Sequence, residues 1–136
     1  MPAEIPPPGR VLDSHAKALT AARAALEKQA EDVVVMDLRT LSTVTDFFII
    51  CTAGSAPQIN AMKDHIDAAL AKQDCPVWHV EGSPIARSAG ALGDAFQWVL
   101  MDCGEVVVHL FDQRARAFYR LEDLWADAPR VLLPAE

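Results

Sequence analysis

Two short apolar runs separated by a polar connector restrict the fold of this chain more than any other feature. The runs are residues 33–36 (VVVM) and 47–52 (FFIICT). A run that is rich in β-branched residues and too short for a helix is typical of a strand buried on both faces of a sheet. Because residues 42–46 between them are few and polar, the two strands are expected to be neighbours in one sheet.

A helix is predicted before the first strand, with Asp13 or Ser14 as its cap. Apolar side chains recur in it at spacings of three and four, the pattern of one helical face, at Leu19, Ala22, Leu26 and Ala30. The mixed charges of the same segment are assigned to its solvated side, at Lys17, Arg23, Glu27 and Lys28.

A second helix is predicted directly after the second strand. Ser55 with Gln58 three residues later matches a capping box, and Pro57 falls in the tolerated first turn. Its apolar stripe, interpreted as core, consists of Ile59, Met62, Ile66 and Leu70.

The second half of the chain continues the alternation of strands and helices. It predicts a strand over 76–80, a long loop from Gly82 to Asp94, a hairpin of 98–101 with 106–111, a short helix over 113–119 and a turn over 121–125. The element order indicates an α/β fold with a mixed sheet of about five strands and flanking helices. Residues 1–10 are expected to be a disordered leader, 11–130 one domain, and 131–136 a frayed tail.

The composition argues against several classes of function. The net charge of −7 argues against wholesale binding of nucleic acid, which draws on clustered Lys and Arg. The apolar runs are far shorter than a membrane helix, and the start lacks the pattern of a signal peptide, so a cytoplasmic location is expected. Cys51, Cys75 and Cys103 are expected to be buried, reduced thiols.

Candidate catalytic groups are sparse. His65 is interpreted as part of a solvated helix, and neither His79 nor His109 has a second ligand at the close spacing of a zinc site. Gly54-Ser55, between a strand and a helix, resembles the opening of a nucleotidyltransferase site. However, no Asp-x-Asp or Asp-x-Glu follows it to hold magnesium, and a helix cap explains Ser55. No cofactor is expected.

The aromatic residues suggest binding. Trp98 begins a strand whose same-side neighbours are Leu100 and Asp102, and a core-facing strand would not normally carry that acid. Trp98 is therefore either an interface anchor or a core residue, and periodicity alone favours neither. Tyr119 poses the same question, whereas Trp78 and Trp125 are interpreted as structural.

Four segments in one register carry a resemblance to a known family. They are 37–50 (DLRTLSTVTDFFII), 81–82 (EG), 98–111 (WVLMDCGEVVVHLF) and 119–125 (YRLEDLW). Together they resemble the ribosomal silencing factor family, also called RsfS or Iojap, from about residue 12 to residue 130.

The resemblance implies a homodimer with a catalytically inactive, nucleotidyltransferase-like fold. It implies binding to the large ribosomal subunit through ribosomal protein fourteen, which would block joining of the small subunit and repress translation when nutrients are scarce. An assembly factor of the large subunit is an alternative that shares this docking site. A nucleotide-binding or nucleotidyltransferase-like enzyme built on Gly54-Ser55 is the alternative of a different class.

The resemblance also implies which residues bind the ribosomal protein. By position these are Trp98, Leu100, Met101, Asp102, Glu105 and Tyr119, with Ser42 and Asp46 as further candidates. Acidic groups around aromatic anchors would complement a basic ribosomal protein. The sequence departs from the family pattern between Gly82 and Trp98, where the family has only a few residues, and the role of this insertion is not apparent from the sequence.

Overall fold

The structure is a computed structural model, and it describes residues 13–75, 77–82, 98–131 and 133. The leader and the loop from Gly82 to Asp94 lie outside the described residues, apart from Gly82 itself. In chain order the elements are α1 (Ser14–Glu27), β1 (Glu31–Asp37), β2 (Phe47–Ala53), α2 (Ala56–Ala71), β3 (His79–Glu81), β4 (Trp98–Asp102), β5 (Val106–Asp112), α3 (Gln113–Tyr119), α4 (Leu121–Leu124) and β6 (Arg130–Val131).

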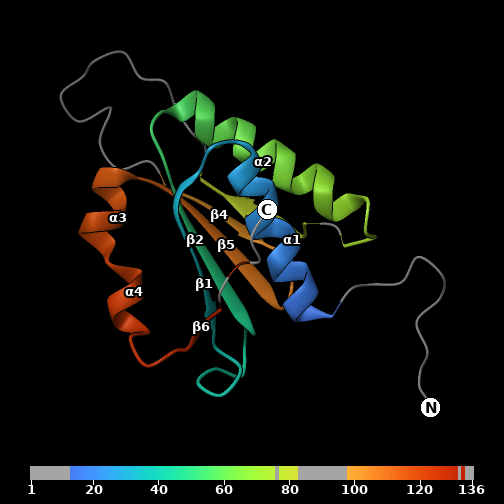
Figure 1. Ribbon diagram of the computed structural model, residues 1–136, viewed down its shortest axis with the longest axis vertical. Helices are drawn as coiled ribbons and strands as arrows, with labels where there is room; N and C mark the ends of the chain where they lie inside the picture. The colour runs from blue at the N-terminus through green and yellow to red at the C-terminus, as the bar shows by residue number, and fades with distance from the viewer. Residues whose placement is uncertain (1–12, 76, 83–97, 132, 134–136) are drawn as a thin grey trace.

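These elements form an α/β fold around one mixed sheet, as the sequence predicts. The strand order is β3-β4-β5-β2-β1-β6, with β2 and β5 parallel and every other neighbouring pair antiparallel. Figure 1 shows α1 and α2 on one face of the sheet, and α3 and α4 on the other. Each face has its own core: Ile49 and Met62 are fully buried in the first, Ile50 and Phe111 in the second.

The described sheet has six strands rather than five. The sixth, β6, pairs with β1 at the pairs Val35–Val131 and Met36–Arg130, so the segment after Pro129 is not frayed there. The third strand also begins later than predicted, at His79. Both strands are short and follow a proline within a few residues, so their bounds carry little local signal in the sequence.

The buried face of α1 differs from the predicted one. Leu26 is exposed and Leu19 is half-buried, whereas Ala18, Ala21, Ala22 and Ala25 are fully buried. The helix packs on α2 and on the sheet through these alanines, because small side chains let helices approach closely. Lys17, assigned to the solvated side, is also buried, with only 5% of its surface exposed.

Among the described helices, none has the length and apolar character needed to cross a bilayer.

Candidate protein-binding surface

The strand β4 alternates between core and surface. Val99 and Met101 are fully buried on the side of α1 and α2, while Trp98, Leu100 and Asp102 are half-buried on the opposite side. The predicted shared side of Trp98, Leu100 and Asp102 is thus confirmed. Met101 belongs to the core, so its side chain is not available to a partner as the resemblance implied.

Cross-strand neighbours extend this surface. Leu100 pairs with Glu81 on β3 and with His109 on β5, and Asp102 pairs with His79 and Val107. In antiparallel sheets directly opposed side chains lie on the same face. We call this surface, made of Glu81, Trp98, Leu100, Asp102 and Tyr119, the β4 face. Glu81 was not among the predicted residues, although the motif Glu81-Gly82 pointed to its neighbourhood.

Trp98 and Tyr119 are in direct contact. Their ring centroids lie 4.6 Å apart, and the indole also stacks on Phe111 at 5.1 Å. Tyr119 comes from the last residue of α3, whereas Trp98 starts β4, so the fold joins two aromatic groups that are distant in sequence. Trp98 is only half-buried and packs against the second core. The interpretation of Trp98 as a core residue is therefore confirmed in part, and its role as an interface anchor stays a prediction.

Arg116 fixes the helix that carries Tyr119. Its Nη1 donates to the carbonyl of Asp32 (2.6 Å) and to the hydroxyl of Thr52 (2.7 Å). Its Nε and Nη2 both donate to Oε2 of Glu122, at 3.2 and 2.7 Å. This ion pair is largely buried and joins α3 to α4. The two hydrogen bonds of Nη1 tie α3 to β1 and β2. Asp112 caps the start of α3 by accepting from the Ala115 N–H.

A buried histidine lies beneath Trp98. Nδ1 of His109 accepts a hydrogen bond from the indole Nε1 of Trp98 at 3.2 Å, and the ring packs edge-on to Phe48. Burial lowers the pKa of His109 to about 4, so the ring is neutral near pH 7. Its Nε2 is buried and has no hydrogen-bond partner among the described residues. The sequence placed His109 in a strand but did not predict this contact.

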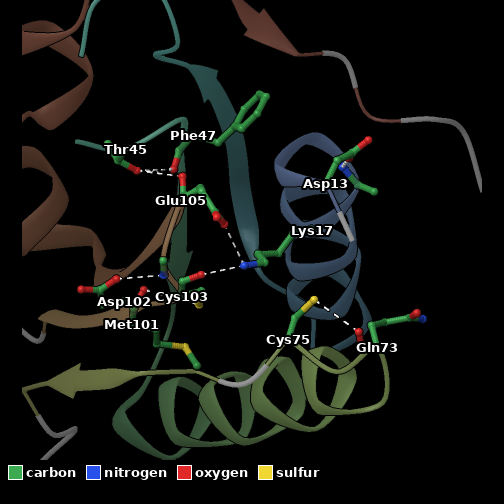
Figure 2. A network of polar contacts seen from close by, with 12 residues as sticks. Asp13, Lys17, Thr45, Phe47, Gln73, Cys75, Met101, Asp102, Cys103 and Glu105 are labelled. Atoms are coloured by element: carbon green, nitrogen blue, oxygen red, sulfur yellow. Dashed lines mark hydrogen bonds and ion pairs between the residues drawn. The ribbon is translucent and has the colours of Figure 1, made fainter. Parts of the chain in front are cut away.

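The acidic candidates lie at the other end of β4, in the turn to β5. Oδ1 of Asp102 accepts from the Gly104 N–H at 3.0 Å, and Gly104 has the positive φ of 88° that this predicted turn requires. Oε1 of Glu105 accepts from Nζ of Lys17 at 3.0 Å, which holds the pKa of Glu105 below its usual value. Figure 2 shows Lys17 reaching this turn from α1, with Asp102 pointing away from it.

Ser42 and Asp46 lie in the connector between β1 and β2, which meets the same turn. The Asp46 N–H donates to the carbonyl of Glu105 at 2.7 Å, and Ser42 Oγ accepts from the Val44 N–H at 3.1 Å. The hydroxyl of Ser42 thus satisfies a backbone group, a common role for a serine in a short connector. The eight predicted residues therefore separate into an aromatic end, an acidic end with its connector, and buried Met101.

At the alternative site, Gly54-Ser55, side chains of the protein itself bind part of the helix start. Ser55 caps α2 by accepting from the Gln58 N–H at 3.1 Å, as predicted. The Gln58 side chain reaches back to the Gly54 N–H at 2.7 Å rather than to the N–H of Ser55. The N–H groups that would hold a phosphate at this helix start are thus partly used by the protein. The described residues contain no group of three or more His, Cys, Asp or Glu placed to hold a metal ion.

The fold and this surface define an α/β domain whose sheet is covered by α1 and α2 on one face. The other face carries α3 and α4 and, beside them, partly exposed aromatic and carboxylate side chains. Comparisons with known proteins give the family. The family described as "Ribosomal silencing factor during starvation" matches residues 11–136, and the chain belongs to it, which confirms the resemblance seen in the sequence.

Individual relatives agree with this assignment. The chain is 38% identical over 113 residues to the ribosomal silencing factor RsfS of Halalkalibacterium halodurans, covering 83% of this chain and 88% of that protein. It is 38% identical over 109 residues to RsfS of Bacillus subtilis, covering 80% and 84%. A crystal structure from Chromobacterium violaceum superposes with a TM-score of 0.72 at 22% identity, covering 92% and 95%, and shows the shared fold.

Proposed function

We propose that this protein is a ribosomal silencing factor that binds the large ribosomal subunit through ribosomal protein fourteen and sterically blocks joining of the small subunit. Its relatives carry the name ribosomal silencing factor. In this proposal it acts in the cytoplasm as a homodimer, represses translation under nutrient limitation and performs no catalysis.

The observation that carries the proposal is the β4 face. The ring of Trp98 contacts Tyr119 and is held by its hydrogen bond to His109, and Leu100 lies on the same side of β4. Aromatic groups held in place before binding lose little conformational freedom when a partner covers them. The carboxylates of Glu81 and Asp102 border this apolar centre. Such an arrangement complements a basic protein surface better than it complements the phosphates of RNA.

The enzyme alternative has less support. The start of α2 is capped by Ser55 and Gln58, which leaves fewer free N–H groups for a nucleotide phosphate. Calorimetric titration with magnesium and each nucleoside triphosphate separates the two classes. We expect no measurable heat of binding, and clear micromolar affinity would contradict a pure binding module.

The proposed contact is tested with purified ribosomal protein fourteen. We expect a complex with the wild-type chain in calorimetry, and weaker binding by Leu100→Ser on the β4 face. Asp64→Asn on α2, which lies across the sheet, is the matched surface control and should bind like the wild type. Equal binding by Leu100→Ser and the wild type would exclude the β4 face as the contact.

A further inference from the structure

An exposed tryptophan borders a groove beside the β4–β5 turn. The groove has a volume of about 400 Å³ and is lined in part by Val44, Thr45, Trp78, Asp102, Gly104 and Glu105. Trp78 is 75% exposed and Val44 is 86% exposed. The interpretation of Trp78 as a structural residue is therefore wrong. Exposure of large apolar side chains to water is energetically unfavourable. Two such side chains at one groove therefore indicate a partner that covers them.

Trp78 is held in position rather than extending freely. The backbone N–H of Trp78 donates to the backbone carbonyl of Asp102 at 2.8 Å. Its ring lies beside Gly104, where an added Cβ would come within 3.9 Å of the indole Cζ2. One part of the indole thus rests on the turn while the remainder faces solvent.

The groove carries negative charge at a fixed place. Asp102 uses Oδ1 to accept the Gly104 N–H, which orients the carboxylate, and its Oδ2 has no hydrogen-bond partner among the described residues. The carboxylate of Glu105 is 55% exposed, and Lys17 reaches it from the buried side of the turn. Lys17 neutralises part of this charge, so Asp102 is the acid most available to a ligand. The chain as a whole is also acidic, at −7.

We propose that this groove receives a lysine or arginine side chain from a basic segment of the protein partner. An indole face attracts a cation, an oriented carboxylate forms a charge-assisted hydrogen bond with it, and Val44 packs against its aliphatic stem. A phosphate group would be repelled by both carboxylates. Asp102 is the last residue of β4, so the groove continues the β4 face. The inference rests on the proposed function and adds a second contact to it.

A direct test uses the protein without ribosomes. The indole N–H signal of Trp78, assigned by its loss in Trp78→Phe, is followed by NMR during titration with a tri-lysine peptide. We expect a saturable shift with tri-lysine, none with tri-glutamate, and a clearly weaker response in Asp102→Asn. Asn keeps an oxygen for the Gly104 N–H, so the turn should remain folded. The proposal is overturned if the Trp78 indole N–H signal does not shift with tri-lysine, or if it shifts equally in Asp102→Asn.

The second test measures affinity for purified large subunits. Trp78→Ala and Asp102→Asn should each weaken binding by about tenfold, whereas Asp64→Asn on α2 should not. Failure of the wild type to bind subunits would contradict the proposed function, while the peptide titration would still test the groove. Normal subunit binding by both groove variants would contradict the proposed role of the groove and leave the proposed function intact. Conversion of a dimer into a monomer by Trp78→Ala would assign the groove to a second copy of the chain and would also overturn it.

Discussion

The indole Nε1 of Trp98 donates a hydrogen bond to Nδ1 of His109 across 3.2 Å, and this contact joins the surface of the sheet to its core. Trp98 is half-buried on β4, whereas His109 is buried on β5. The bond requires an unprotonated Nδ1, which agrees with the lowered pKa of His109. The orientation of the main aromatic group on the β4 face therefore depends on a neutral histidine beneath it.

This contact predicts a loss of stability in mild acid. The folded-state pKa of His109 is lowered from 6.5 to about 4, so the unfolded chain takes up the proton first as the pH falls. Its contribution to stability is complete above pH 6.5 and is lost progressively toward pH 4, roughly 2 kcal/mol by pH 5. Urea unfolding at pH 7 and pH 5 measures this loss. In His109→Gln the loss should be smaller, and an identical loss in both proteins would show that His109 does not cause it.

Substitutions on β4 should separate binding from folding. Trp98→Ala removes packing on Phe111 and Tyr119 and the donor to His109, so we expect its free energy of unfolding to fall by about 3 kcal/mol. Leu100→Ser should cost about 1 kcal/mol because Leu100 is only half-buried. Binding of large subunits should nevertheless weaken about tenfold or more in Leu100→Ser. Thermal unfolding and co-sedimentation compare the two quantities. If the loss of binding is proportional to the loss of stability in both variants, the contact with the large subunit lies outside β4.

Lys17 should be important for stability although it is charged. Its Nζ donates to the carbonyl of Cys103 at 2.9 Å and to Glu105 at 3.0 Å, and the side chain is buried. Lys17→Met keeps the length but leaves a buried carbonyl unsatisfied, which costs about 1–3 kcal/mol. Chemical denaturation measures the loss, and Lys28→Met at the exposed end of the same helix is the control. Equal stability of the two variants would mean that the Lys17 contacts contribute little.

The three cysteines should be unreactive in the native protein. All are free and buried, and burial raises the pKa of both Cys51 and Cys103 to about 12. Because the thiolate is the reactive form, a chromogenic disulfide reagent at pH 8 should modify these thiols only after denaturant is added. Rapid reaction of one equivalent in native buffer would show that the chain opens locally around a thiol.

Strong local signals explain why most elements were predicted from the sequence. The apolar runs became β1 and β2, Ser55 caps α2, and the turn glycine of the hairpin is Gly104 with a positive φ. Each of these depends on neighbouring residues alone. The strand β6 was missed because a strand of two residues is too short to carry a periodic pattern, and only pairing with β1 makes it a strand.

The site was predicted less completely because it depends on tertiary contacts. The alternation of β4 correctly grouped Trp98, Leu100 and Asp102, yet the same alternation places Met101 in the core. Lys17 was assigned to solvent because it is charged, although it lies one helical turn before buried Ala21. The acceptors of its hydrogen bonds, the carbonyl of Cys103 and the carboxylate of Glu105, are distant from Lys17 in sequence. The exposure of Trp78 likewise results from how it rests on the turn, which no local pattern reveals.

Silencing by obstruction of subunit joining can be measured by sedimentation of purified large and small ribosomal subunits, with and without this protein, at fixed magnesium. We expect the joined-ribosome peak to fall while the protein travels with the large subunit, and Leu100→Ser to restore the peak. A protein that binds neither subunit, or that travels with joined ribosomes without reducing them, would contradict silencing by steric obstruction.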